Sequence, residues 1–400
     1  MTSSTYDAVI IGAGLVGLSV GYHLKLKSSR KRVLLIEKED RVAAHQSGHN
    51  SGVLHSGIYY KPGSLKAKNC ISGYTALLEF AKQYNIPHQI CGKLIIATSE
   101  DETHALNKIF ERGQMNGLKG LKKIAKEEIH NYEPHASGIA AIYVPQTGII
   151  DYPKVAEKLL YLFTQELGGE AVFGERVINI LSQGEQHIIE TSSGSYTAKN
   201  IISCAGLHSD RIASLTKRAS DLRIIPFRGE YYKLKPERED LVNNLIYPVP
   251  DSKFPFLGVH FTRMIRGGIE AGPNAVLAFK REGYKFQDIG LSDIAGTLFW
   301  PGFWKIVTKY GKTGAGEIYR SLSKKAFTKA LQKLIPEIQE DDLINGGSGV
   351  RAQACDREGN LIDDFNILED GNIIHVRNAP SPAATACLSI GNFISDKIKN

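Results

Sequence analysis

The first forty residues alternate between the pattern of a buried strand and that of an amphipathic helix. Ala8–Ile11 is a short apolar run, apolar positions at helical spacing extend from Leu15 to Leu24, and Val33–Ile36 is a second apolar run. Short apolar runs are typical of buried strands, whereas a recurrence every three to four residues is typical of a helix with one buried face. The pattern therefore predicts a strand–helix–strand unit at the start of the chain.

The same two patterns continue along the middle of the chain. Helical periodicity is found in residues 64–84, 101–113 and 152–167, and apolar runs typical of strands are found in residues 93–98, 171–181 and 200–206. Apolar and polar positions alternate over residues 223–285, with turn signals at Pro236, Pro250 and Gly267. This alternation predicts an antiparallel sheet.

The last third predicts helices and then a return to strands. Residues 291–335 have a helical and basic pattern, and the tail from Ile344 predicts short strands and a closing helix over 383–398. A chain of 400 residues is long enough for two domains. We therefore predict an α/β fold, α+β overall, in which a Rossmann-like domain and a mostly antiparallel-sheet domain are interleaved. The predicted Rossmann-like domain comprises residues 1–85, 145–222 and 344–400, and the predicted substrate domain comprises residues 86–144 and 223–343.

The turn of the first unit carries a dinucleotide-binding motif. Gly12, Gly14 and Gly17 have G-x-G-x-x-G spacing, and the second strand is followed by Glu37 and then Lys38. The first glycine permits the tight turn, the second lets a pyrophosphate approach the backbone, and the third lets the helix pack on the strand. The acid after the second strand suits an adenosine ribose without a 2′-phosphate. The complete unit predicts a bound dinucleotide.

Two later segments favour a flavin over a nicotinamide cofactor. The strand NIISCAG ends in the small residues Ala205 and Gly206, and the C-terminal segment 378–391 again resembles a loop that leads into a helix. The N–H groups at the start of such a helix can face the flavin ring, and Ser381 and Thr385 are predicted to cap it. We therefore expect the Rossmann-like domain to bind FAD.

Composition limits the partners and the compartment. The net charge of +7 is only mildly basic, which suits an anionic substrate or a membrane surface and gives little support for nucleic acid. The five cysteines include no C-x-x-C pair, so neither a disulfide framework nor a metal site is predicted. The polar first residues and the lack of a long apolar stretch predict neither a signal peptide nor a membrane span. We expect a cytoplasmic protein, and the oligomeric state stays open.

Five segments carry a resemblance to a known family. The chain resembles the L-2-hydroxyglutarate dehydrogenases, also called oxidases, within the flavoenzyme superfamily of D-amino-acid oxidase and glycine oxidase. The segments are HNSGVLHSGIYYKPGSLKA (49–67), FRGEYY (227–232), GPNAVLAF (272–279), GVRAQ (349–353) and NAPSPAATACLSIG (378–391). The resemblance implies oxidation of L-2-hydroxyglutarate to 2-oxoglutarate by hydride transfer to flavin N5, with electrons passed to a membrane quinone or to oxygen. The alternatives are an amino-acid oxidase of the same superfamily and a non-enzymatic flavin-binding redox sensor.

The resemblance also indicates which residues contact FAD. His49 lies where some relatives in the superfamily carry a covalent flavin link, but for this family we expect FAD to be held non-covalently. The predicted FAD contacts are Gly12, Gly14, Gly17, Glu37, Lys38, His49, Asn50, Ser51, Gly52, Val177, Ala205, Gly206, Ser381, Pro382, Ala383 and Thr385.

Oxidation of a 2-hydroxy acid requires a base for the hydroxyl proton and a cation for the carboxylate. His55 is our first choice for the base, because a neutral imidazole suits that role, and His260 is the second. Arg351 in GVRAQ matches the carboxylate-binding arginine of the related amino-acid oxidases, although Ala352 follows it where those relatives have proline. Tyr59 is a further substrate contact. For the distal carboxylate of a dicarboxylate substrate the sequence offers four cations, namely Arg228, Lys66, Lys68 and Arg263.

A basic and aromatic stretch, residues 298–333, includes both tryptophans, Trp300 and Trp304, and several lysines. Aromatic side chains next to cations are typical of a segment that lies on an anionic membrane. We therefore predict peripheral docking on the inner face of the cell membrane. The alternative is an aromatic cluster packed against the protein's own core or a second subunit.

Overall fold

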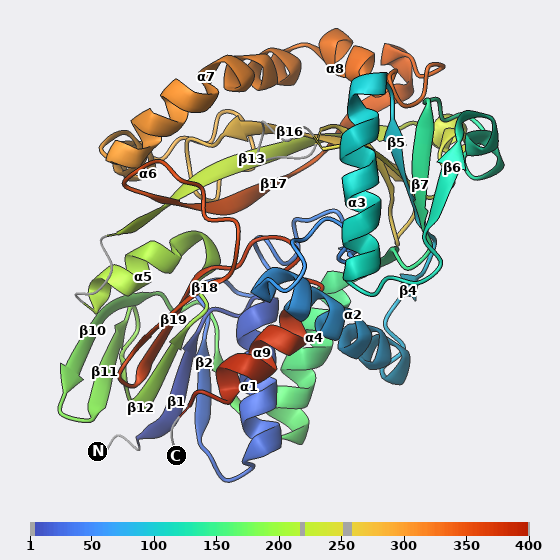
Figure 1. The fold of residues 1–400 in the computed structure, drawn as a ribbon. Coiled ribbons are helices and arrows are strands. Elements are labelled where there is room, and N and C mark those ends of the chain that lie inside the picture. Colours follow the sequence, from blue (N-terminus) through green and yellow to red (C-terminus); the bar gives the residue numbers. More distant parts are fainter. Residues whose placement is uncertain (1–4, 217–220, 251–257, 399–400) are drawn as a thin grey trace.

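The computed structural model describes residues 5–216, 221–250 and 258–398, which form two large sheets with helices on both (Figure 1). The first sheet has eight strands in the order β10-β11-β12-β1-β2-β9, and β19 and β18 continue it beside β12. Its strands are β1 (Tyr6–Ile11), β2 (Val33–Ile36), β9 (Glu170–Val172), β10 (Val177–Gln183), β11 (Gln186–Thr191), β12 (Ser195–Ser203), β18 (Asn366–Asp370) and β19 (Ile373–Asn378). The pairs β1–β2, β1–β12, β2–β9 and β12–β19 are parallel, as expected of a Rossmann-like unit, whereas β11 pairs antiparallel with both β12 and β10.

The two faces of β1 enter different cores. Ala8 and Ile10 pack in the cluster under the helices, whereas Val9 and Ile11 pack in the cluster on the opposite face. Successive side chains of a strand point to opposite faces, so an unbroken apolar run is what a strand covered on both sides requires. The helices of this domain are α1 (Leu15–Lys27), α2 (Leu65–Gln83), α4 (Tyr152–Tyr161), α5 (Ser209–Leu215) and α9 (Cys387–Ser395).

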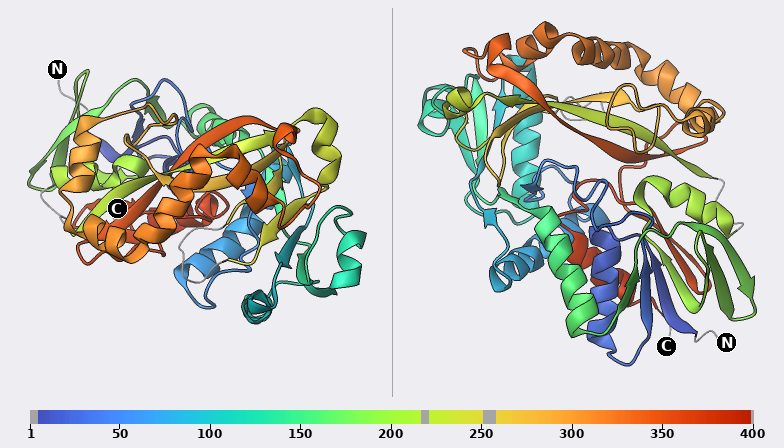
Figure 2. Two further views of the ribbon diagram at one scale, coloured as in Figure 1. Left: turned by 90° about the horizontal axis from the view of Figure 1, so that it is seen from above. Right: turned by 180° about the vertical axis from the view of Figure 1, so that it is seen from behind.

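The second sheet lies above the first and is antiparallel except at one pair, β14 with β5. Its order is β17 (Leu343–Asp356), β13 (Leu222–Leu234), β16 (Ile269–Leu277), β15 (His260–Arg263), β14 (Leu245–Pro248), β5 (Lys93–Ala97), β7 (Ala140–Val144) and β6 (Lys122–Ala125). Figure 2 shows from behind that the long helix α7 (Pro301–Leu322) runs across the face of this sheet that is turned away from the first sheet. Helices α6 (Leu291–Leu298) and α8 (Lys324–Leu331) contact α7. Helix α3 (Thr103–Met115) packs beside β5 and β7 of the same sheet.

Short elements complete the chain. A third sheet holds β3 (Val53–Leu54), β8 (Gly148–Ile150) and β4 (His88–Gln89). Short 3-10 helices lie at η1 (Glu100–Glu102), η2 (Lys126–Asn131), η4 (Gly206–His208), η5 (Pro236–Leu241) and η6 (Glu340–Asp342), and η3 (Leu162–Glu166) is a π-helix that follows α4. Along the segments that the structure describes, no helix is both long and apolar enough to cross a membrane.

The elements predicted from periodicity are found, with three corrections. The apolar run 171–181 is two strands, because Gly174 adopts a φ of +73° and turns the chain between β9 and β10. The tail from residue 344 does not begin with a short strand. It begins with the 14-residue β17, which pairs with β13 and so belongs to the second sheet instead of the nucleotide domain. The closing helix starts at Cys387 and not at residue 383.

Candidate active site

A cavity of about 900 Å³ lies between the two large sheets. One end is lined by the β1–α1 turn and the end of β2, and the other end by residues of β13, β14, β15 and β17. Pockets of several hundred cubic ångströms at the junction of two domains are typical of cofactor and substrate sites. The cavity is therefore the candidate active site.

The glycine turn is shaped by close backbone contacts. Gly12 has a φ of +108°, and a Cβ on it would lie 2.6 Å from the carbonyl oxygen of Cys204. A Cβ on Gly17 would lie 2.0 Å from the carbonyl oxygen of Gly12, which is why the helix approaches the turn so closely. Gly14 lines the cavity, whereas Gly17 supports the turn from behind the wall. This turn leaves room for the pyrophosphate of a dinucleotide at the start of α1.

The acid at the end of β2 also faces the cavity. Glu37 accepts hydrogen bonds from the backbone N–H groups of Ala13 (2.7 Å) and Glu39 (3.0 Å). These bonds hold the carboxylate beside the glycine turn, where the ribose of a dinucleotide would lie in a Rossmann-like fold.

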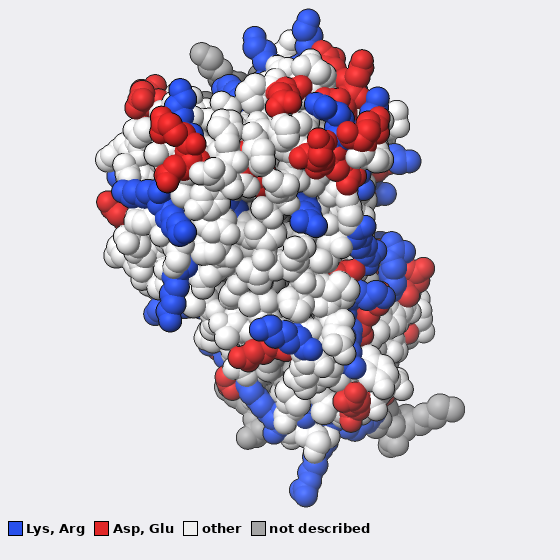
Figure 3. Space-filling view, turned by 90° about the vertical axis from the view of Figure 1, so that its right-hand side faces the viewer, with Lys and Arg blue, Asp and Glu red and all other residues white. Residues whose placement is uncertain are grey.

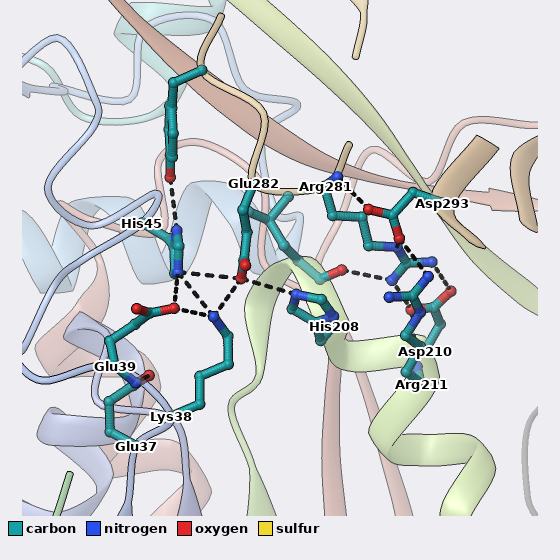
Figure 4. A network of polar contacts seen from close by, with 12 residues as sticks. Glu37, Lys38, Glu39, His45, His208, Asp210, Arg211, Arg281, Glu282 and Asp293 are labelled. Carbon is teal, nitrogen blue, oxygen red and sulfur yellow. Dashed lines mark hydrogen bonds and ion pairs between the residues drawn. The ribbon is translucent and has the colours of Figure 1, made fainter. Parts of the chain in front are cut away.

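Lys38 is engaged in an ion-pair network that joins the two halves of the molecule (Figure 4). Its ammonium lies 2.6 Å from Glu282 and also contacts Glu39. His45 and His208 donate to the same Glu282 carboxylate, and together these partners hold its pKa well below the usual range despite partial burial. Lys38 borders the cavity, but its charge is already paired.

The loop before β3 and the loop before α9 form the walls beside the turn. His49, Asn50 and Ser51 line the cavity, and the His49 ring stacks on Tyr284 at 4.2 Å. Gly52 lies off the wall and accepts a backbone hydrogen bond from Ile150 at 2.8 Å. The remaining predicted FAD contacts on the wall are Val177, Ala205, Gly206, Ser381, Pro382 and Ala383.

The prediction for Thr385 is wrong. Thr385 is fully buried, and its hydroxyl accepts from the backbone N–H of His55 (3.1 Å) and lies 2.8 Å from the Tyr152 hydroxyl. Helix α9 begins after Ala386 without a side-chain cap, so neither Ser381 nor Thr385 caps it. Thr385 instead fixes the backbone of the segment that carries His55.

The end of the cavity away from the glycine turn gathers the predicted catalytic groups. His55 lies with Nε2 3.3 Å from the Ser381 hydroxyl, and His260 on β15 has Nδ1 2.8 Å from the Gly258 carbonyl. Burial is the main cause that lowers the pKa of each histidine to about 3, with nearby cations adding to it. Both imidazoles are therefore neutral near pH 7 and able to accept a proton.

Arg351 and three tyrosines complete this end. Arg351 on β17 lines the cavity, as Tyr231 does, and its charge contributes to the lowered pKa of both histidines. Tyr59 also lines the cavity, as expected. Tyr231 and Tyr247 lie on the wall without having been predicted, because tyrosines in an alternating sheet pattern do not differ from packing residues.

The prediction that Arg228 anchors substrate is wrong. Its side chain is 1% exposed and donates to the Glu230 carboxylate (2.6 and 2.9 Å) and to the Lys285 carbonyl (3.0 Å), away from the cavity.

Only one of the other three candidate cations lies on the wall. Lys66 lines the cavity and pairs with Asp363 at 2.7 Å. Lys68 is exposed on α2, and Arg263 is exposed at the end of β15, where it donates to the Asn243 carbonyl. Lys93 on β5 was not predicted as a candidate cation, and it lies behind the cavity wall. A lysine that opens an otherwise apolar strand, KLIIA, was the available signal.

The basic aromatic stretch divides between core and surface. Trp300 is 4% exposed, packs with Phe303, and donates from Nε1 to the Asp356 carbonyl at 3.0 Å, so its predicted place at a membrane is wrong. Phe299 and Trp304 are 87% and 54% exposed. Trp300, directly before α7, and Phe303, three residues later, lie on the side that packs on the sheet. Trp304 lies toward the outer side.

Comparisons with known proteins agree with this geometry. Residues 7–397 match the family described as FAD dependent oxidoreductase. The chain is 58% identical to the L-2-hydroxyglutarate dehydrogenase of Indibacter alkaliphilus, with 98% of both chains covered. It is 44% identical to the mitochondrial L-2-hydroxyglutarate dehydrogenase of Homo sapiens, over 100% of this chain and 89% of that protein.

Solved structures show the same fold. An L-alpha-glycerophosphate oxidase from Mycoplasma pneumoniae with FAD bound has a TM-score of 0.78 at 25% identity, with 99% of this chain and 96% of that chain covered. A glycine oxidase from Geobacillus kaustophilus has a TM-score of 0.71 at 15% identity, with the same coverage. The fold and the glycine turn, with the family match, define an FAD-dependent oxidoreductase, and the chain is thus an enzyme. Within that class, the identities of 58% and 44% place it in the L-2-hydroxyglutarate dehydrogenase family.

Proposed function

We propose that the protein oxidises L-2-hydroxyglutarate to 2-oxoglutarate. The observation that carries this proposal is the 58% identity, over 98% of both chains, to a protein named for that activity. The cavity supports it, because two neutral histidines and an arginine converge at the end opposite the glycine turn. A base and a carboxylate-binding cation are the two groups that oxidation of a 2-hydroxy acid requires from the chain.

Each side chain has a defined task in this proposal. The planar guanidinium of Arg351 binds the α-carboxylate through both oxygens and thereby orients the α-carbon. His55, neutral at pH 7, accepts the hydroxyl proton at a ring nitrogen, and His260 is the alternative base. FAD, held non-covalently, would lie along Gly12, Gly14 and Glu37 and would supply the hydride acceptor.

The substrate is tested by product formation with an artificial electron acceptor. The holoenzyme is incubated separately with L-2-hydroxyglutarate, L-glutamate and glycine, and 2-oxoglutarate or the corresponding oxo acid is quantified. We expect 2-oxoglutarate from the hydroxy acid and no comparable turnover of the amino acids. Faster oxidation of glutamate or glycine would favour the amino-acid oxidase alternative and contradict the proposal.

We further propose that electrons leave to a membrane quinone, with oxygen as the alternative acceptor, at the inner face of the cell membrane. Residues 298–333 include exposed apolar side chains on α6 and α7 together with lysines. A second cavity of about 340 Å³ lies between α7 and β17. It shares Gln353 and Asp363 with the main cavity and so offers a route from the outer helix toward that cavity.

A further inference from the structure

Lys93 is a buried cation without a carboxylate partner among the residues that the structure describes. It lies on the central strand β5 with 1% of its surface exposed, and its ammonium is 4.4 Å from the ring centre of Tyr59 and 4.8 Å from that of Tyr247. A buried charge is costly, and contacts with two aromatic faces offset only part of that cost. An anion next to the ammonium would offset the rest of this cost.

One neighbour of Lys93, Tyr59, also lacks a hydrogen-bond partner in the described part of the chain. The Tyr59 hydroxyl is buried and has no hydrogen-bond partner among the described side chains and backbone. Both tyrosines line the cavity, so Lys93 lies directly behind its wall. An anion that enters this end of the cavity would approach a cation and a hydroxyl for which the described residues supply no negatively charged partner.

Two cations lie near the histidine end of the cavity. Tyr247 stacks on His260 at 3.9 Å, contacts Lys93 through its ring and is also influenced by the charge of Arg351. The charges of Lys93 and Arg351 both lower the pKa of His55 and of His260. The charges of both cations thus reach the same two histidines, which suits a ligand with two anionic groups.

We propose that Lys93 is the specificity residue for the distal carboxylate, and that its buried ammonium makes this end of the cavity favour a dianion over a monocarboxylate. Arg351 binds the α-carboxylate, and Lys93 acts from behind Tyr59 and Tyr247 on the second one. This inference rests on the proposed function and names a residue that determines its substrate. Lys66, the other cation on this wall, is already paired with Asp363.

The proposal has a pH dependence of definite sign. Burial lowers the pKa of Lys93 to about 7, so its charge is present below that pH and is lost as pH rises. The titratable groups that face Lys93 have pKa values well away from 7. They are Cys70 on α2 with a pKa of about 12, Tyr59 and Tyr247 with raised pKa values, and His55 and His260 with pKa values of about 3. Preference for a dianion is therefore expected to decline from pH 6 to pH 8.5.

The test is a binding titration of the FAD-loaded enzyme with two inert anions of equal length, glutarate and pentanoate, followed by the flavin absorbance. Glutarate carries both carboxylates, and pentanoate has a methyl group at the distal end. We expect Lys93→Met to weaken glutarate binding about ten- to hundredfold while pentanoate binding changes less than about threefold. Lys93→Arg should retain the preference. Lys68→Met, an exposed lysine off the wall, is the matched control.

Several outcomes would overturn the inference. An unchanged glutarate preference in Lys93→Met, or its loss in Lys66→Met alone, would assign the distal carboxylate elsewhere. Should Lys93→Met fail to retain FAD, the wild-type enzyme still decides, since a preference that stays constant between pH 6 and pH 8.5 contradicts the role of Lys93. Because the titration needs no turnover, it remains informative if the enzyme does not oxidise L-2-hydroxyglutarate, a result that would refute the proposed function alone.

Discussion

Arg351 is the residue on which substrate binding is expected to depend most. It lines the cavity from β17, and its charge reaches Tyr231, His55 and His260. A charge-assisted hydrogen bond contributes about 1.5–3 kcal/mol, so Arg351→Met should raise the KM for L-2-hydroxyglutarate roughly ten- to hundredfold. The FAD content should be unchanged, since Arg351 lies away from the glycine turn. A KM within about twofold of wild type would assign the carboxylate to another residue.

His55 is expected to control the chemical step. General-base catalysis typically contributes about 10²- to 10⁴-fold, so His55→Ala should slow anaerobic flavin reduction at saturating substrate by a factor in that range. The matched variant His260→Ala should have a smaller effect, because its ring is stacked on Tyr247 and bonded to the Gly258 carbonyl. If His55→Ala reduces flavin at the wild-type rate and His260→Ala does not, the base is His260.

At the residue scale, the sequence predicted the nucleotide end better than the substrate end. Gly12 and Gly17 are determined by backbone contacts that only glycine permits, so spacing alone identifies them. Arg228 and Lys93 are both buried cations, yet one is paired with Glu230 and the other lies behind the cavity wall. That difference depends on contacts between distant strands, which local pattern does not contain.

The outer helices α6 and α7 are the elements expected to contact a membrane. Co-sedimentation with anionic vesicles should be reduced in Phe299→Ser/Trp304→Ser, because both side chains are exposed and apolar. Basic residues near an anionic surface contribute about 1 kcal/mol each, so wild-type binding should also fall at high salt. Met115, 73% exposed on α3, provides the control variant Met115→Ser. Equal sedimentation of all three proteins would show that the helices do not dock on lipid.

Element boundaries follow from tertiary pairing as much as from local pattern. Strand β17 extends over 14 residues because β13 supplies partners along its whole length, from Leu222 opposite Asp356 to Leu234 opposite Leu343. Its apolar positions are interrupted by the run of small residues Gly346, Gly347, Ser348 and Gly349, so periodicity indicated only short strands there. By contrast, α1 and α2 begin and end within a few residues of their predicted limits, since their buried faces repeat over several turns.

On the scale of the whole molecule, the cavity exists because the two sheets are held together above the nucleotide-binding turn. The network of Lys38, Glu39, His45, His208 and Glu282 joins the β2 loop to the segment after β16, and the buried pair Arg281–Asp210 adds a second connection (Figure 4). Elsewhere the charges are mixed. On the side that carries β6 and β7, basic and acidic side chains are interspersed around an uncharged centre (Figure 3).

We propose one protein that binds FAD in this cavity and oxidises L-2-hydroxyglutarate there. The most direct measurement is the anaerobic absorbance spectrum of the holoenzyme during titration with L-2-hydroxyglutarate and, separately, with its D-enantiomer. We expect the L-enantiomer to bleach the flavin stoichiometrically with formation of 2-oxoglutarate, and the D-enantiomer to leave the oxidised spectrum unchanged. A flavin that stays oxidised with the L-enantiomer, or a purified protein that releases no FAD on denaturation, would contradict this proposal.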